Sequence, residues 1–305
     1  MMIRRSAVFA AAIFLTAVFF GCGRNDAPIA AAGETAPYYT EDFSYVLYEA
    51  DGAPAVEITG VVQEHKTEYI VPPEIDGVPV TAIGSDAFIY APVAGLILPD
   101  TLAVIGNGAF YNCAALTSVK IPGSVSVIDD YAFYFCTMLR DVSIPKNCAD
   151  IGGLAFYGTP WFESLHAEFE IHGDGNLIDY NGGGGKVVIP PGVKRISSAF
   201  YRNTSVTSVT LPDTVIKIGS AAFDGCISLV SAEIPESITV IGDSAFYGCA
   251  ALKSLTIPAG VTHIGVNTFD GCGTLTLFCH AGSYAAEYAG SNGIGCRIIN
   301  ESGNQ

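Results

Sequence analysis

Basic residues are scarce in this sequence, and their scarcity narrows the partners that the protein can have. Its 305 residues include 14 lysines and arginines against 30 aspartates and glutamates, which gives a formal net charge of −16. Proteins that bind nucleic acid need basic patches that release counterions from the phosphate backbone. The composition therefore argues against nucleic acid and against anionic membrane surfaces as partners.

Long hydrophobic runs are missing after residue 20, so no later segment is expected to span a bilayer. The beginning of the chain differs, because Met1–Arg5 contains two arginines and Ser6–Phe20 is almost wholly apolar. A positive segment, an apolar segment of this length and then a small residue are typical of a secretory signal peptide. We predict a signal peptide over residues 1–21 and export of the chain.

Cys22 directly follows the small residue Gly21, as the lipidated cysteine does in a bacterial lipobox, although Phe19 and Phe20 replace the usual leucine and small residue. The alternative is an ordinary signal peptide that happens to be followed by a cysteine. The lipobox interpretation predicts lipidation of Cys22, which anchors the exported protein to the bacterial cell envelope. Residues 22–41, rich in alanine, glycine and polar residues, then form a flexible tether, and the lipid is the only contact with the membrane.

A repeat of about 23 residues dominates the rest of the chain. One landmark is an Ile-Pro or Leu-Pro pair, which begins at Leu98, Ile121, Ile144, Ile189, Leu211, Ile234 and Ile257. The other is a phenylalanine, found at Phe88, Phe110, Phe133, Phe156, Phe200, Phe223, Phe246 and Phe269, in steps of 22, 23, 23, 44, 23, 23 and 23 residues. A unit of this size cannot bury its own apolar side chains, so successive units must stack on one another.

Each unit is expected to supply one short strand. Leu255 and Ile257 alternate with the polar Ser254 and Thr256, which is strand periodicity, and Pro258 ends the strand. The glycine that follows the repeat isoleucine in four units (Gly106, Gly219, Gly242 and Gly265) is expected to allow the turn that places the phenylalanine ring in the interior. Successive units should rise by roughly 5 Å and form a parallel sheet on one face.

Three segments depart from the repeat. An Asp51-Gly52 turn between alternating segments predicts a hairpin, and a second hairpin is expected around Gly173–Gly175 inside the doubled unit. Ser283 is a good N-cap for a short helix, which a final strand over Cys296–Ile299 follows. We predict an N-terminal cap hairpin over residues 42–80, repeat block 1 over 81–160, an inserted hairpin over 161–188, repeat block 2 over 189–275, and a C-terminal cap and tail over 276–305.

The repeated pattern Ile-Pro-x-x-Val-x-x-Ile-Gly-x-x-Ala-Phe-x-x-Cys-x-x-Leu resembles the BspA-like class of bacterial leucine-rich repeat. The resemblance covers roughly Asp42 to Asn300. It implies a curved, right-handed solenoid with a parallel strand face, a hairpin at the N-terminal end and a helix-containing cap at the C-terminal end. It also implies a location on the bacterial surface and adhesion to proteins of a host or a neighbouring cell.

Most of the nine cysteines follow the repeat. Five lie three residues after a repeat phenylalanine, at Cys113, Cys136, Cys226, Cys249 and Cys272, and Asn203 fills the same slot in another unit. We predict that these thiols are buried packing residues and that Asn203 points inward. Cys279 and Cys296 lie outside this column, and whether they form a disulfide is left open.

No sequence pattern predicts an enzyme, a cofactor or a metal. Gly182–Lys186 resembles a phosphate loop only superficially, because Val187 stands where serine or threonine is needed. The five histidines share no ligand spacing, and Asp129-Asp130 has no partnering acid or histidine at a useful offset. We therefore expect a binding protein without catalytic residues.

The candidate binding face is the residue that precedes the Ile or Leu of each Ile/Leu-Pro pair. The residues we single out in this column are Lys120, Ser143, Thr210, Glu233 and Thr256. Such a small, polar stripe is either a solvated sheet face or a ligand platform. This column contains no aromatic residue, whereas a glycan-binding surface would be expected to expose several. A protein ligand is therefore favoured over a glycan, and hence an adhesive surface lipoprotein. The alternative is a structural or accessory envelope lipoprotein that tethers a secreted enzyme or a polysaccharide.

Overall fold

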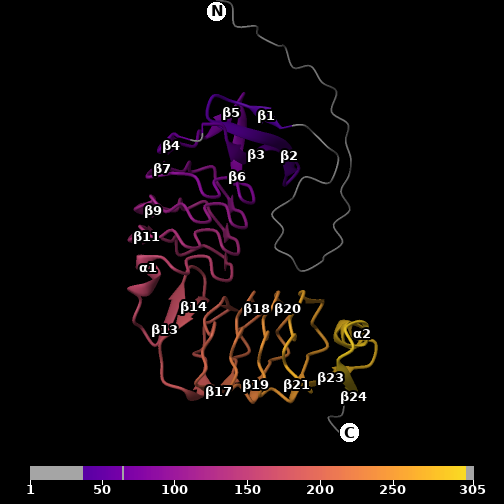
Figure 1. Ribbon diagram of the computed structural model, residues 1–305. Helices are drawn as coiled ribbons and strands as arrows, with labels where there is room; N and C mark the ends of the chain where they lie inside the picture. The colour runs from indigo at the N-terminus through magenta and orange to yellow at the C-terminus, as the bar shows by residue number, and fades with distance from the viewer. Residues whose placement is uncertain (1–36, 64, 300–305) are drawn as a thin grey trace, which may run out of the picture.

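The computed structural model describes residues 37–63 and 65–299, so the predicted signal peptide and Cys22 lie outside the described residues. The chain winds into stacked turns that form a solenoid with a bend near its middle (Figure 1). Each regular turn supplies two short strands, one to each of two columns. The predicted curved solenoid with parallel strands is confirmed.

The inner column lies on the inside of the bend (Figure 1). Its strands pair in parallel and most are two residues long: β6 (Val78–Ile83), β8 (Val104–Ile105), β10 (Val127–Ile128), β12 (Asp150–Ile151), β16 (Arg195–Ile196), β18 (Lys217–Ile218), β20 (Val240–Ile241) and β22 (His263–Ile264). This column was not predicted, because a strand of two residues is too short to show an alternation of apolar and polar residues.

The outer column follows the outside of the bend and contains the strands that were predicted. They are β4 (Glu68–Ile70), β7 (Gly95–Ile97), β9 (Ser118–Lys120), β11 (Asp141–Ser143), β15 (Gly185–Val188), β17 (Val206–Thr210), β19 (Ser231–Glu233), β21 (Ser254–Thr256) and β23 (Thr276–His280). In these strands Val119, Val209 and Leu255 point into the core, while their neighbours face solvent.

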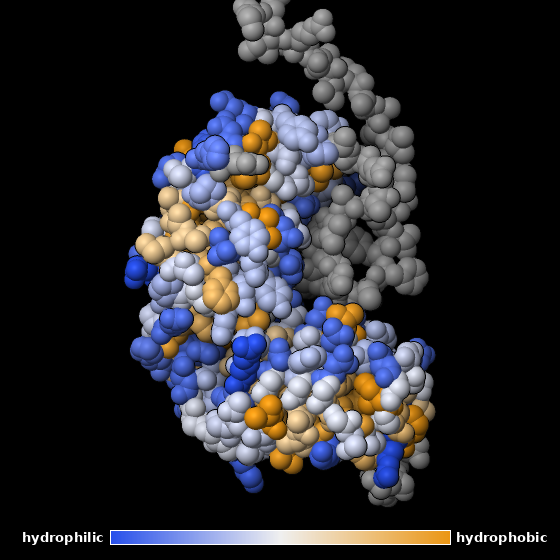
Figure 2. Space-filling view, in the orientation of Figure 1, coloured by the Kyte–Doolittle hydropathy of each residue, from blue (hydrophilic) through white to orange (hydrophobic). Residues whose placement is uncertain are grey.

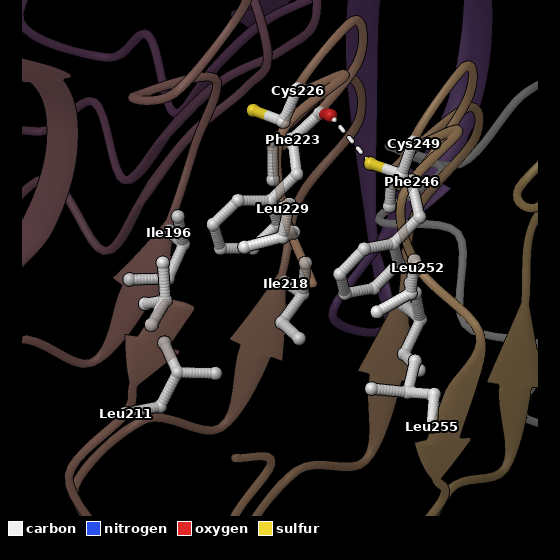
Figure 3. Close-up of a cluster of buried hydrophobic side chains, with 14 of the residues drawn as sticks. Ile196, Leu211, Ile218, Phe223, Cys226, Leu229, Phe246, Cys249, Leu252 and Leu255 are labelled. Carbon is white, nitrogen blue, oxygen red and sulfur yellow. Dashed lines mark hydrogen bonds between the residues drawn. The ribbon is translucent and has the colours of Figure 1, made fainter. Parts of the chain in front are cut away.

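The space between the columns is filled by the repeat phenylalanines, which stack ring on ring. Centroids of successive rings lie 4.8–5.2 Å apart from Phe88 to Phe156 and 5.0–5.7 Å apart from Phe200 to Phe269. Leucines such as Leu229 and Leu252 pack below the rings, as Figure 3 shows. The spacing matches the rise of one strand per turn, so every turn contributes the same side chains to a shared core.

The repeat glycines have a different role from the one predicted. Gly106 and Gly242 do not adopt the left-handed conformation; a Cβ on Gly106 would lie 2.9 Å from the carbonyl oxygen of Ile83, and one on Gly242 would lie 2.6 Å from the nitrogen of Ser220. The left-handed residue comes two positions later, for example at Ser244 (φ 53°). Glycine is needed because adjacent turns approach closely, and not because the turn requires it.

Both ends of the stack are closed as expected. Strands β2 (Phe43–Ala50) and β3 (Ala53–Val61) form an antiparallel hairpin, with β1 (Tyr38–Tyr39) added to β2, and β3 then pairs in parallel with β6. The strand β5 (Glu74–Ile75) forms an antiparallel pair with β6. At the other end α2 (Tyr284–Ser291) begins at Ser283, whose hydroxyl accepts a hydrogen bond from the nitrogen of Ala286, and β24 (Gly295–Ile299) pairs with β23. No helix in residues 37–63 or 65–299 is long and apolar enough to cross a membrane.

An insertion separates the two blocks of regular turns. It consists of α1 (Pro160–Glu163) and an antiparallel hairpin of β13 (Phe169–His172) and β14 (Asn176–Tyr180). Strand β14 takes the place of an inner strand, because Asn176 accepts a hydrogen bond from the nitrogen of Ile151 and pairs in register with Arg195. On the outer side β11 and β15 belong to different sheets. On the inner side β12 and β14 also belong to different sheets, and the side chain of Asn176 joins them through its hydrogen bond with the nitrogen of Ile151.

Candidate binding surfaces

The five candidate residues end the outer strands, and the structure divides them into two groups. Lys120 and Ser143 are opposite each other on β9 and β11, while Thr210 and Glu233 are opposite each other on β17 and β19. Four of the five are exposed, and Thr210 is half-buried and donates a hydrogen bond of 3.0 Å to the Glu233 carboxylate. The insertion lies between these two pairs, as the predicted order of block 1, hairpin and block 2 implies.

Aliphatic side chains extend the same column. Ile70 and Ile97 stand opposite each other on β4 and β7 and are 65% and 59% exposed, and Val188 on β15 is 68% exposed. The outward column of each block thus begins with large aliphatic residues and continues with small polar or charged ones. The view in Figure 2 shows hydrophobic and hydrophilic residues interspersed over the described surface.

The cysteine column is buried, as predicted, and it also makes a regular set of hydrogen bonds. The thiol of Cys249 donates to the carbonyl oxygen of Phe223 in the preceding turn, at 3.1 Å (Figure 3). The same bond, to the phenylalanine of the turn before, measures 3.0–3.1 Å from Cys113, Cys136, Cys226 and Cys272. Burial raises the pKa of Cys226 to about 12 and that of Cys272 to about 11. These are unreactive thiols that satisfy buried carbonyls.

Asn203 does not continue this set. It is half-buried, and its side-chain oxygen accepts hydrogen bonds from the nitrogen and hydroxyl of Ser205 and from the nitrogen of Val206. It therefore shapes the local turn, and the inward orientation predicted for it is wrong. In the C-terminal cap, Cys296 stands opposite Leu277, two residues before Cys279. The thiols of Cys279 and Cys296 interact but form no disulfide.

Carboxylates and cations meet where the two blocks join. Asp150 is 4% exposed, and its oxygens lie 2.6 Å from the Lys217 nitrogen and 3.9 Å from Nε of Arg195. Asp130 accepts a hydrogen bond from the nitrogen of Gly153, and burial together with the charge of Asp130 raises the pKa of Asp129 to about 7. Asp129 and Asp130 have no partner at a short sequence offset, but the fold brings groups from other turns next to them, among them Gly153 and Lys217.

A ladder of tyrosines escaped the sequence analysis. Each follows a repeat phenylalanine or lies one residue beyond it, and successive ring centroids are 5.1–5.7 Å apart through Tyr90, Tyr111, Tyr134, Tyr157 and Tyr201. The aligned repeats do carry this signal, because each tyrosine stands one or two residues after its phenylalanine. Next to Tyr157 lies a groove of about 460 Å³ that also touches the insertion. No group of three or more potential metal ligands occurs in the part of the chain that the structure describes.

Comparison with solved structures finds bacterial leucine-rich repeat proteins. A leucine-rich cell surface protein from Faecalibacterium prausnitzii is 23% identical, with a TM-score of 0.41 over 89% of this chain and 97% of that one. A leucine-rich repeat protein of T. pallidum is 22% identical, with a TM-score of 0.38 over 86% and 98% of the two chains. No curated protein matches the sequence.

A family model decides the assignment. The model of the BspA-type leucine-rich repeat region matches six copies, over residues 69–172 and 185–284. These ranges contain the stacked phenylalanines, the cysteine column and both strand columns, and the gap between them falls in the insertion. The chain belongs to the BspA-type leucine-rich repeat family.

Proposed function

We propose that this protein is an exported, lipid-anchored surface protein of a bacterium that binds a protein ligand through its outer strand column. The signal peptide and Cys22 supply the export and the anchor, and membership of the family favours a binding role over catalysis. The F. prausnitzii relative is described as a cell surface protein, which agrees with this location.

The observation that carries the proposal is the exposed pair of Ile70 and Ile97. Exposure of large aliphatic side chains to water is unfavourable, and their burial against a partner protein would contribute favourable free energy to binding. Small and charged residues such as Lys120 and Ser143 continue the column beside them, so the surface has the mixture of an apolar centre and a polar rim that protein interfaces show. In block 2, Thr210, Glu233 and Thr256 would extend the contact.

The test is capture of extracellular-matrix and envelope proteins by the mature protein, followed by measurement of affinity for the ligand recovered. The double variant Ile70→Ser/Ile97→Ser should weaken binding by at least about tenfold, which corresponds to roughly 1.4 kcal/mol. The control is Asp270→Lys, an exposed residue that lies off the outer column. The proposal is wrong if the isoleucine variant binds as well as the unchanged protein, or if the control loses as much affinity.

A further inference from the structure

The groove beside the tyrosine ladder lies where the last turn of block 1 meets the insertion. Its volume is about 460 Å³, and three aromatic side chains line it: Phe135, Tyr157 and Phe162. Its polar lining comes from the insertion, with Glu163, His166, Asp179 and Asn181, and Gly158 and Leu165 complete it. This volume is within the range of small-molecule sites in proteins.

The three rings are steeply inclined to one another. The centroid of Phe135 lies 6.1 Å from that of Tyr157 at an interplanar angle of 73°, and Phe162 lies 6.2 Å from Tyr157 at 53°. Because all three rings line the groove, a bound group would contact more than one of them. The ladder already holds one cation, because the guanidinium carbon of Arg202 lies 5.0 Å from the ring centroid of Tyr201.

Phe135 occupies a position that does not suit phenylalanine. Its φ of 55° is left-handed, and four other turns have glycine at the equivalent position, at Gly158, Gly225, Gly248 and Gly271. A bulky residue in this conformation is strained, whereas glycine is not. The ring is also 40% exposed, so core packing does not explain it. The ring contacts that of Tyr134, at a centroid distance of 4.6 Å, and lines the groove.

The charge of the insertion indicates the sign of the ligand. Residues 161–188 contain five carboxylates, at Glu163, Glu168, Glu170, Asp174 and Asp179, against the single basic residue Lys186, and Asp174 is paired with Lys194. Two of these carboxylates line the groove. Asp179 is half-buried and is held by a hydrogen bond of 2.9 Å from the side-chain amide of Asn181. An anionic ligand would be repelled here, and a cation is complementary.

We propose that this groove binds a quaternary ammonium group, with Phe135, Tyr157 and Phe162 as its aromatic walls and Glu163 and Asp179 as its counter-charges. The methyl groups of such a cation bury against aromatic rings while its charge is attracted to their faces. It needs no hydrogen-bond acceptors, unlike a primary ammonium, which would have to replace those it gives up in water. This site is separate from the outer strand column and does not depend on the function proposed for it.

Choline is the probe, and ligand-observed NMR on the mature, full-length protein is the measurement. Choline should show saturable binding at least about tenfold tighter than its uncharged carbon isostere, in which a tert-butyl group replaces the trimethylammonium. Nα-acetyl-lysine amide, whose free side-chain ammonium represents a lysine of a polypeptide, should bind more weakly than choline. Equal binding of the isostere, tighter binding of the lysine amide, or no saturable binding of choline would each overturn the assignment.

Two variants separate the ring from the fold. Phe135→Gly installs the residue that other turns use, so it should leave the melting temperature unchanged or higher and weaken choline binding by at least about tenfold. Its matched control is Tyr90→Gly, another exposed, left-handed aromatic that does not line the groove (φ 57°), and it should bind choline normally. The double variant Glu163→Gln/Asp179→Asn should weaken choline and leave any residual binding of the isostere unaltered. Unchanged choline binding by Phe135→Gly, or by the double carboxylate variant, contradicts the proposal.

Discussion

At the scale of single residues, the repeat makes the interior highly predictable. Because the turns are in register, one aligned column of the sequence becomes one row of side chains, and the buried phenylalanines and cysteines follow directly from it. The hydrogen bond from each cysteine to the carbonyl of the preceding turn could not be predicted, since it depends on the separation of the turns. The close approach of adjacent turns, which requires glycine at positions such as Gly242, could not be predicted either, because it also depends on the separation of the turns.

Thiol reactivity tests this picture of the interior. Cys296 is exposed, whereas the five column cysteines are buried and hydrogen-bonded. A thiol reagent at pH 8 should therefore modify Cys296 quickly and the column only as the protein unfolds, because burial keeps the column thiols protonated. Mass spectrometry of the labelled peptides follows the order. Labelling of Cys226 or Cys249 as fast as Cys296 would mean that the column is accessible.

At the scale of elements, the insertion and the junction it creates are the least predictable part of the molecule. The hairpin itself follows from the sequence, because the glycines around Asp174 mark a turn between two alternating segments. Its replacement of one inner strand does not, since this depends on the hydrogen bonds of Asn176 to the neighbouring turn. The ion pair of Asp150 and Lys217 could not be predicted either, because the two residues are 67 positions apart in the sequence.

The junction ion pair should matter far more than a similar pair on the surface. Lys217 and Lys194 each lie 2.6–2.7 Å from an aspartate, but Asp150 is buried and Asp174 is exposed. Lys217→Met removes the cation that lies nearest in the described ion pairs of the buried Asp150, so we expect a loss of about 2–3 kcal/mol in the free energy of unfolding. Lys194→Met should cost less than about 1 kcal/mol. Urea denaturation of both variants decides, and equal losses would contradict the role of the junction.

Stability should also change with pH through Asp129. Its pKa in the folded protein is about 7, whereas an unfolded aspartate titrates near 4, so the folded state binds this proton more tightly. The contribution of this group is therefore full below about pH 4, falls as the pH rises to about 7, and is level above that. Asp129→Asn should remove the fall, which we expect to be about 1–2 kcal/mol because water still reaches this half-buried carboxyl. Unfolding free energies of both proteins at pH 5 and pH 8 test this, and parallel changes would exclude Asp129 as the cause.

At the scale of the whole molecule, the repeat predicts a stack of turns, and its doubled step of 44 residues predicts the insertion that divides the stack into two blocks. The insertion lies between the part of the outer column around Ile70 and Lys120 and the part around Thr210 and Glu233. The tyrosine ladder was not predicted, although each tyrosine stands one or two residues after a repeat phenylalanine. It belongs to the surface, which the periodicity of the core does not determine.

The anchor gives a prediction for the intact chain. If Cys22 is the lipidated residue, the mature protein should begin there and carry a diacylglycerol mass, and Cys22→Ala should yield uncleaved or released protein. Mass spectrometry of the mature N-terminus provides the measurement. An unmodified N-terminus at another residue would show that the segment is an ordinary signal peptide.

The central claim is that the outer column binds a protein ligand independently of the stability of the fold. It is tested most directly by charge reversal at Lys120 and Glu233, one residue in each block, with the affinity for the captured ligand and the melting temperature measured on the same samples. Both side chains are exposed, so the melting temperature should move by less than about 2 °C, while the affinity should fall by at least about tenfold. Normal binding by this double variant, with contacts mapped to the inner column or to the insertion, would contradict the claim.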